Sequence, residues 1–150
     1  KGLGGGFPVA ACLAREDAAV ALSAGSHGST FGGNPLAMAA ANAVLDVIMA
    51  PDFLSGVSEV AQKLWVQLLD LAAEYPKVIE EIRGSGLMLG IKCKVDSTDL
   101  RKKLLEAQML SVGAADNVIR ILPPLIIDDS HIDEAIQILH SVCSKIDGAS

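Results

Sequence analysis

The chain has 150 residues, a formal net charge of −6, and 51% apolar but only 3% aromatic residues. The acidic balance, with no basic stripe, argues against nucleic acid as a partner, and no apolar run reaches the ~20 residues that a membrane-spanning helix needs. Nor is there the apolar stretch of a signal peptide behind the first lysine. A mean hydropathy of +0.42 is high for a small domain, so we expect part of its surface to contact another subunit or further chain.

The first third of the chain combines glycine-rich turns with one strong helix signal. An apolar run at residues 8–14 suggests a short buried strand. Residues 16–22 resemble one or two helical turns, and residues 23–35, with four glycines, form a loop by composition. An asparagine-proline pair then predicts a helix start, because asparagine caps well and proline suits the first helical position. This helix, residues 35–49, is apolar nearly all round.

A break near residue 50 divides the chain. Pro51 ends the apolar helix and Gly56 marks a second weak point. We therefore expect two domains, residues 1–50 and residues 51–150. Apolar residues at spacings of three and four then predict an amphipathic helix over residues 57–72.

After this helix the apolar pattern changes to short β-type runs. A turn at residues 83–86 follows the first run, and a hairpin-like turn at residues 113–117 lies between the last two. We predict strands at 78–82, 87–93, 109–112 and 118–122, and helices at 99–108 and 128–146. This order favours a small α+β domain with an antiparallel sheet covered by helices.

Cysteine and histidine supply no clear catalytic or metal pattern. Cys12, Cys93 and Cys143 are far apart and sit among apolar residues, so we expect buried free thiols in a reducing compartment. His131 and His140 are nine residues apart on one predicted helix and do not share a face. We therefore expect no metal site.

Lys1 precedes four glycines within five residues. Glycine leaves space beside a lysine, and a lysine amine forms Schiff bases with carbonyl compounds when its pKa is lowered. The alternative is an ordinary exposed lysine, which the residues alone favour.

The loop "GSHGSTFGG" suits a phosphate group. Its backbone N–H groups and the hydroxyls of Ser29 and Thr30 can point at phosphate oxygens ahead of a helix. It lacks the Gly-Lys-Ser/Thr ending of a Walker A loop. An ordinary glycine-serine connection is about equally consistent with it.

Arg120 lies inside the apolar run "NVIRILPP". A charge in such a strand needs a partner, which is either an internal acid or the carboxylate of a substrate held by a bidentate contact. Arg83 allows the same two interpretations.

Four segments together resemble a known family. "KGLGGGFPVAACLA", "HGSTFGGNPLAMAAANAVLDVI", "RGSGLMLGI" and "NVIRILPPLII" occur in this order and spacing in acetylornithine aminotransferases, which are class-III, fold-type-I enzymes that use pyridoxal phosphate. The resemblance covers nearly the whole chain. It implies an α/β fold in which residues 1–50 end the large cofactor domain and residues 51–150 form the small C-terminal domain.

The resemblance also implies residue roles. Lys1 corresponds to the lysine that holds pyridoxal phosphate as a Schiff base and shuttles a proton. Thr30, with Ser29 beside it, corresponds to the threonine that binds the cofactor phosphate of the other subunit in a homodimer. Arg120 corresponds to the arginine near the substrate carboxylate, and Arg83 is structural or adjacent to substrate.

The function implied is transfer of the δ-amino group of N-acetylornithine to 2-oxoglutarate, in arginine biosynthesis in the cytoplasm. Family members are more than twice as long, and the part that precedes the lysine carries further cofactor and substrate groups. We therefore expect the 150-residue chain to be inactive alone. The alternatives are an ornithine, succinylornithine or 4-aminobutyrate aminotransferase, or a non-catalytic dimerisation module with the small-domain fold.

Overall fold

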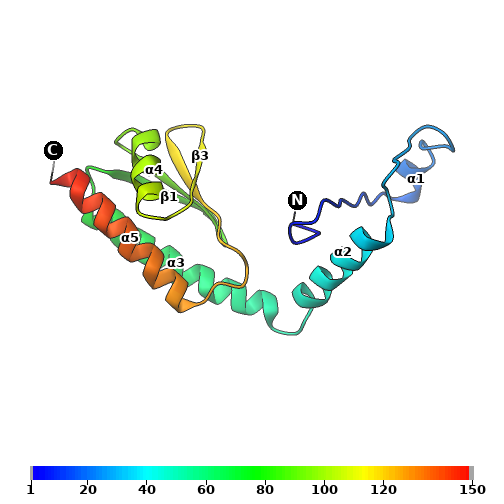
Figure 1. Cartoon of the computed structure of the whole chain (residues 1–150), viewed down its shortest axis with the longest axis horizontal. Helices are drawn as coiled ribbons and strands as arrows, with labels where there is room; N and C mark the ends of the chain where they lie inside the picture. The colour runs from blue at the N-terminus through cyan, green and yellow to red at the C-terminus, as the bar shows by residue number, and fades with distance from the viewer. Residues whose placement is uncertain (1, 149–150) are drawn as a thin grey trace. The chain divides into compact units, whose positions relative to one another are not determined.

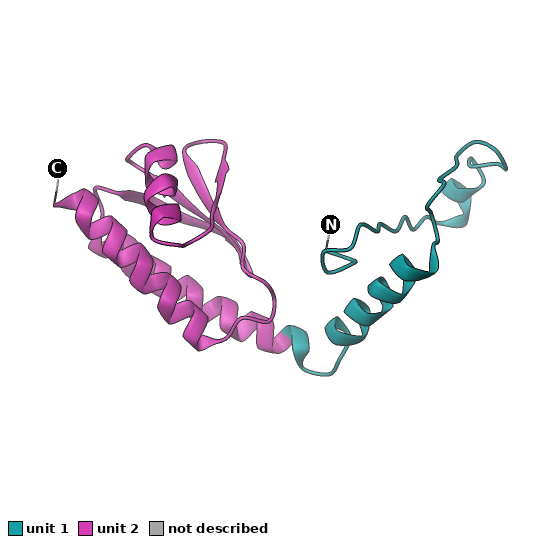
Figure 2. Cartoon of the chain, in the orientation of Figure 1, with its two compact units in different colours: residues 1–54 teal, residues 55–150 magenta. Residues whose placement is uncertain are grey.

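A computed structural model describes residues 2–148 and divides the chain into two compact units, residues 1–54 and residues 55–150 (Figure 2). The division rests on contacts within the chain and does not identify either unit as the large or the small domain of an enzyme. The expected domain assignment, with its boundary at residue 50, therefore stays a prediction.

Unit 1 contains two helices, α1 (Glu16–Ala19) and α2 (Pro35–Ile48). The predicted start of α2 is confirmed: the Asn34 side-chain oxygen accepts a hydrogen bond from the Ala37 amide at 2.9 Å, and Pro35 occupies the first helical position. This cap satisfies one of the amides that a helix start leaves unpaired. The helix thus begins from local chemistry alone.

Two predictions for unit 1 are wrong. Residues 8–14 form no strand, and the helix predicted over residues 16–22 is limited to the four residues of α1. An isolated apolar run has no edge to pair with here, because every strand of the described chain belongs to unit 2. Cys12 lies in this run and is exposed, so the expectation that all three cysteines are buried is also wrong.

Unit 2 is built on a four-stranded antiparallel sheet, as predicted. Its strands are β1 (Ile79–Ser85), β2 (Met88–Cys93), β3 (Val112–Ala114) and β4 (Val118–Ile121), arranged in the order β1-β2-β4-β3 (Figure 1). The antiparallel register places Ile82 opposite Ile91, and Ile91 opposite Ile119. Because opposed residues share a face, these three isoleucines mark the buried side of the sheet.

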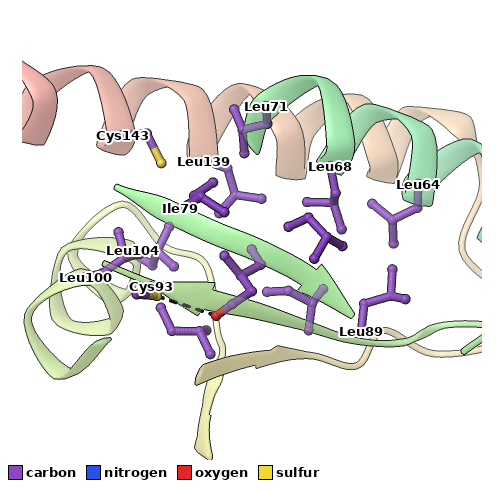
Figure 3. Packing of buried hydrophobic residues seen from close by; sticks show 14 of the residues in the cluster. Leu64, Leu68, Leu71, Ile79, Leu89, Cys93, Leu100, Leu104, Leu139 and Cys143 are labelled. Atoms are coloured by element: carbon purple, nitrogen blue, oxygen red, sulfur yellow. Dashed lines mark hydrogen bonds between the residues drawn. The ribbon is translucent and has the colours of Figure 1, made fainter. Parts of the chain in front are cut away.

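Two long helices, α3 (Phe53–Glu74) and α5 (Asp129–Asp147), lie side by side on the sheet (Figure 1). Figure 3 shows Leu64, Leu68 and Leu71 of α3 directed toward the strands. The shorter helix α4 (Ser97–Glu106) adds Leu100 and Leu104. All of these side chains are at most 3% exposed, and they belong to one continuous apolar core.

The helix signals of unit 2 are largely confirmed, although the element bounds differ. Helix α3 is longer than the predicted 57–72, and the third strand begins three residues later than predicted. Asp96 caps α4 and Asp128 caps α5 through side-chain hydrogen bonds to the first amides of each helix. Gly84 is required by the sheet itself: its φ is +137°, and a Cβ there would collide with the Met88 carbonyl oxygen.

No single helix within residues 2–148 has both the length and the apolar content to cross a membrane. Helices α2 and α3 meet both conditions only when they are taken together, as a pair interrupted by residues 49–52.

Candidate functional site

The predicted site residues fall in three places. Lys1 lies outside the described residues, so its predicted role is not tested. Ser29 and Thr30 lie in the loop before α2 in unit 1. Arg120 lies in β4 in unit 2.

The glycine turn that follows Lys1 is tightly folded. The Gly5 amide donates to the Gly2 carbonyl at 3.1 Å, and the Phe7 amide donates to the Gly4 carbonyl at 2.9 Å. A Cβ at Gly4 would collide with the Phe7 carbonyl oxygen, and a Cβ at Gly5 would come within 2.9 Å of Val44 in α2. Glycine is therefore needed because the turn closes on itself and packs against α2.

The serine-threonine loop is open and carries free donors. Within residues 2–148 the hydroxyls of Ser29 and Thr30 have no hydrogen-bond partner. The Gly32 amide donates to the Ser29 carbonyl at 3.4 Å, and a Cβ at Gly32 would approach Ser29 Oγ at 3.0 Å. The missing side chain of Gly32 thus leaves room beside the Ser29 hydroxyl.

This donor set fits a phosphate group. Two exposed neighbouring hydroxyls and the amides of a glycine-rich loop match the hydrogen-bond acceptors of a phosphate dianion. The loop runs directly into the start of α2, where unpaired amides favour negative charge. The chemistry of the loop is therefore consistent with the phosphate of pyridoxal phosphate.

The second part of the candidate site is a row of residues across the sheet of unit 2. Arg83 of β1 pairs with Gly90 of β2, and Gly90 pairs with Arg120 of β4. We call Arg83, Gly90 and Arg120 the arginine row. Opposed residues point to the same face, and this row alternates with the buried row of isoleucines. The two arginines therefore lie on the side of the sheet opposite the core, separated by a glycine.

Two acids neutralise part of the positive charge on this face. Asp116, in the turn between β3 and β4, lies 3.0 Å from Arg83 and 3.6 Å from Lys92. Glu80 lies 3.2 Å from Lys92. The hydrogen bond from Arg83, followed by the charge of Lys92, lowers the pKa of Asp116, which keeps this carboxylate ionised.

Arg120 is the cation that these acids leave unmatched. It has no ion-pair partner within residues 2–148, and its Nε is buried without a hydrogen-bond acceptor. An unpaired buried donor is costly, and a carboxylate that binds a guanidinium through two parallel hydrogen bonds would satisfy it. Arg120 borders a cavity of about 250 Å³ that is also lined by Arg83 and Gly90. An anion in this cavity would satisfy the unpaired donor of Arg120.

The buried thiols are poor candidates for catalysis. Burial raises the pKa of Cys93 to about 11 and that of Cys143 to about 12. Both thiols therefore stay protonated at neutral pH, and a thiol is the weaker nucleophile. Within residues 2–148 there is also no group of three His, Cys, Asp or Glu side chains that could hold a metal ion.

Sequence reasoning identified both arginines but missed Gly90 and Asp116. A lone glycine inside a strand often marks a close approach of another group, and Gly90 gave this signal. Asp116 gave none, because its pairing with Arg83 depends on how separate strands align.

The sequence matches the model of one protein family and is similar to several of the family's curated members. The model of the family "Aminotransferase class-III" matches residues 1–143. Acetylornithine aminotransferase of Mesorhizobium japonicum is 53% identical over 136 residues, which is 91% of this chain and 34% of that protein. The enzyme of the same name from Agrobacterium fabrum is 56% identical over 126 residues, 84% of this chain and 32% of that protein.

Solved structures give the same result. The chain resembles ornithine delta-aminotransferase of Plasmodium falciparum with a TM-score of 0.83 and 30% identity, covering 92% of this chain and 36% of that one. It resembles acetylornithine aminotransferase of Elizabethkingia anophelis with a TM-score of 0.79 and 28% identity, covering 89% and 36%. The chain spans about a third of the length of the relatives that it matches.

Proposed function

The chain belongs to the class-III aminotransferase family, and on this basis we propose that it is part of a transaminase that moves the δ-amino group of N-acetylornithine to 2-oxoglutarate. One structural observation carries the proposal. Arg120 is an unmatched guanidinium with a buried, unpaired Nε, at the edge of a cavity on the open face of the sheet. Both proposed substrates carry a carboxylate that this group can bind.

Pyridoxal phosphate, the cofactor of this family, supplies an electron sink for cleavage at the amino-acid α-carbon or its ω-amino equivalent. We propose that Lys1 holds the cofactor and moves the proton between the substrate carbon and the cofactor. We assign the phosphate of the cofactor bound in the partner subunit to the hydroxyls of Ser29 and Thr30 and to the neighbouring loop amides, which have the right donors. Arg120 orients the substrate by its carboxylate.

We further propose a cytoplasmic homodimer that acts in arginine biosynthesis, with Thr30 binding the cofactor phosphate of the partner subunit. Exposed apolar side chains support a subunit contact at α2: Leu36 and Val47 of the helix, and Met49 at its C-terminal cap, are each at least half exposed. Exposed large apolar side chains are typical of obligate interfaces. The 150-residue chain alone is expected to be inactive.

A coupled assay on the complete gene product tests the assignment. It measures glutamate formed from 2-oxoglutarate with N-acetylornithine or ornithine as amino donor. We expect a higher kcat/KM with N-acetylornithine, and Arg120→Gln should raise the KM for 2-oxoglutarate about 100-fold, because a charge-assisted bidentate contact is lost. A preference for ornithine would instead support the second candidate, ornithine aminotransferase, which the structural likeness at TM-score 0.83 keeps open.

Borohydride reduction tests the role of Lys1. The complete gene product is loaded with pyridoxal phosphate, reduced and digested, and the adduct is located by mass spectrometry. A stoichiometric adduct on the Lys1 side chain supports the proposal. Adducts scattered over surface lysines would contradict it and favour a non-catalytic module.

A further inference from the structure

The side chain of Arg83 lies across the open face of the sheet. Arg83 belongs to β1, and its Cγ would lie 3.5 Å from a Cβ at Gly90 on β2. Its terminal nitrogen lies 3.0 Å from the carboxylate of Asp116, in the turn between β3 and β4. This path exists because Gly90 has no side chain. A Cβ at Gly90 would also come within 3.0 Å of Val118 Cγ1 on β4. The ion pair between Arg83 and Asp116 therefore connects β1 with the β3–β4 turn. It crosses β2 at Gly90, where no side chain is in the way.

Asp116 belongs to the turn that presents Arg120. This turn connects β3 with β4, and Asp116 and Asn117 both have positive φ, at 63° and 55°. Asn117 fixes one side of the turn: its side-chain amide donates to the carbonyls of Cys93 and Val95, and its oxygen accepts from the Ser97 amide. Asp116 fixes the other side through Arg83. Arg120 follows three residues after Asn117 on the same hairpin.

We propose that Arg83 and Asp116 form a positioning pair that holds the β3–β4 hairpin and thereby sets the guanidinium of Arg120 for carboxylate binding. This inference rests on the proposed role of Arg120. Asp116 also neutralises Arg83, so that Arg120 is the unmatched cation of the arginine row. Arg83 thus acts through Arg120 and does not bind substrate itself.

The rival explanation is electrostatic. Arg83 lines the same cavity as Arg120, and it could attract the carboxylate directly. The two explanations differ in sign for one variant. Asp116→Asn frees Arg83 and makes the face more positive, so direct attraction predicts tighter anion binding, whereas a positioning pair predicts weaker binding.

The experiment measures binding of glutarate, a dicarboxylate without a reactive keto group, to the complete gene product by calorimetry. Arg83→Met keeps most of the side-chain stem over Gly90, and Asp116→Asn keeps a residue that tolerates positive φ. We expect each variant to raise the dissociation constant about tenfold, since a small displacement of an orienting group is costly. The double variant should also lose about tenfold, because the two residues act as one unit.

Three controls make the result decisive. Lys63→Met and Asp129→Asn break another exposed ion pair of unit 2, at 2.8 Å, and should leave glutarate binding unchanged. Arg83→Lys, which can still reach toward the acid, should recover most of the affinity. Arg120→Gln should lose about 100-fold; if it does not, the proposed function fails and not only the positioning pair.

The positioning pair is overturned if Asp116→Asn tightens glutarate binding while Arg83→Met weakens it. It is also overturned if both variants behave like the Lys63 and Asp129 controls while Arg120→Gln abolishes binding. A variant that does not fold is identified by its melting curve. If Asp116→Asn does not fold, Asp116→Gly replaces it, because it removes the same charge at a position with positive φ.

Discussion

Residues 2–54 leave most of their large apolar side chains exposed, whereas residues 55–148 bury or half-bury most of theirs around one core. In unit 1 the buried apolar side chains of the described part are Ala37 and Ala41, while Leu13 and Phe31 are more than 80% exposed. In unit 2, α3, α5 and α4 all contribute leucines to the same cluster. In unit 1 the start of α2 is therefore set by its cap, whereas the helices of unit 2 also share one buried core.

Cysteine labelling should show the largest difference between the units. In the 150-residue chain, an alkylating reagent at pH 8 should modify Cys12 at least ~100-fold faster than Cys93 or Cys143. Cys12 is exposed, whereas the pKa of Cys93 is about 11, which leaves on the order of one thiol in a thousand as thiolate. Mass spectrometry of timed samples measures the rates, and labelling in denaturant is the control. Equal rates would mean that the core of unit 2 opens readily.

Leucine-to-alanine substitutions should show the same difference between the units in the free energy of unfolding. Leu68, which is 0% exposed, lies beside Leu69, which is 45% exposed, on α3. We expect Leu68→Ala to lower the free energy of unfolding by about 2–5 kcal/mol and Leu69→Ala by about 1 kcal/mol or less. In unit 1, Leu36→Ala on α2 should cost about 0.5 kcal/mol or less.

Urea unfolding followed by circular dichroism measures all three variants. A large loss for Leu36→Ala would contradict the contrast, because it would require a packed environment around α2 that residues 2–148 do not provide.

Local signals in the sequence predicted much of this fold. The asparagine-proline pair at residues 34–35 fixed the start of α2, and the apolar spacing of α3 and α5 identified their buried faces. These signals succeed because caps and helical periodicity act within a few residues. The strand predicted at residues 8–14 was wrong, because an apolar run forms a strand only where another strand pairs with it.

The same distinction explains what was predicted of the site. Arg120 was identified because a charge inside an apolar strand stands out in the sequence itself. Asp116 was not, because it meets Arg83 only when β1, β2 and β4 align in one register. Sequence spacing along one element does not give the alignment of separate strands.

The smallest expected effect concerns the caps of α2 and α5. Asn34 caps α2 with a neutral amide, whereas Asp128 caps α5 with a carboxylate. The hydrogen bond from Ser130, followed by that from His131, lowers the pKa of Asp128 to about 2, below the value of about 3.9 in an unfolded chain. A lowered folded-state pKa means that the stabilisation is complete above pH 4 and is lost as the pH falls toward 2.

Asp128→Asn isolates this effect, because asparagine also caps helices. The difference in unfolding free energy between the wild-type chain and Asp128→Asn should shrink as the pH falls from 5 to 2, and urea titrations at each pH measure it. Asn34→Asp places a titratable cap on α2 and serves as the matched variant in unit 1. No neighbour equivalent to Ser130 and His131 supports a carboxylate there among the described residues, so its pH dependence should be weaker. If Asn34→Asp gains a pH dependence as large as the one that Asp128→Asn loses, the low pKa of Asp128 comes from the helix end alone and not from its two side-chain partners.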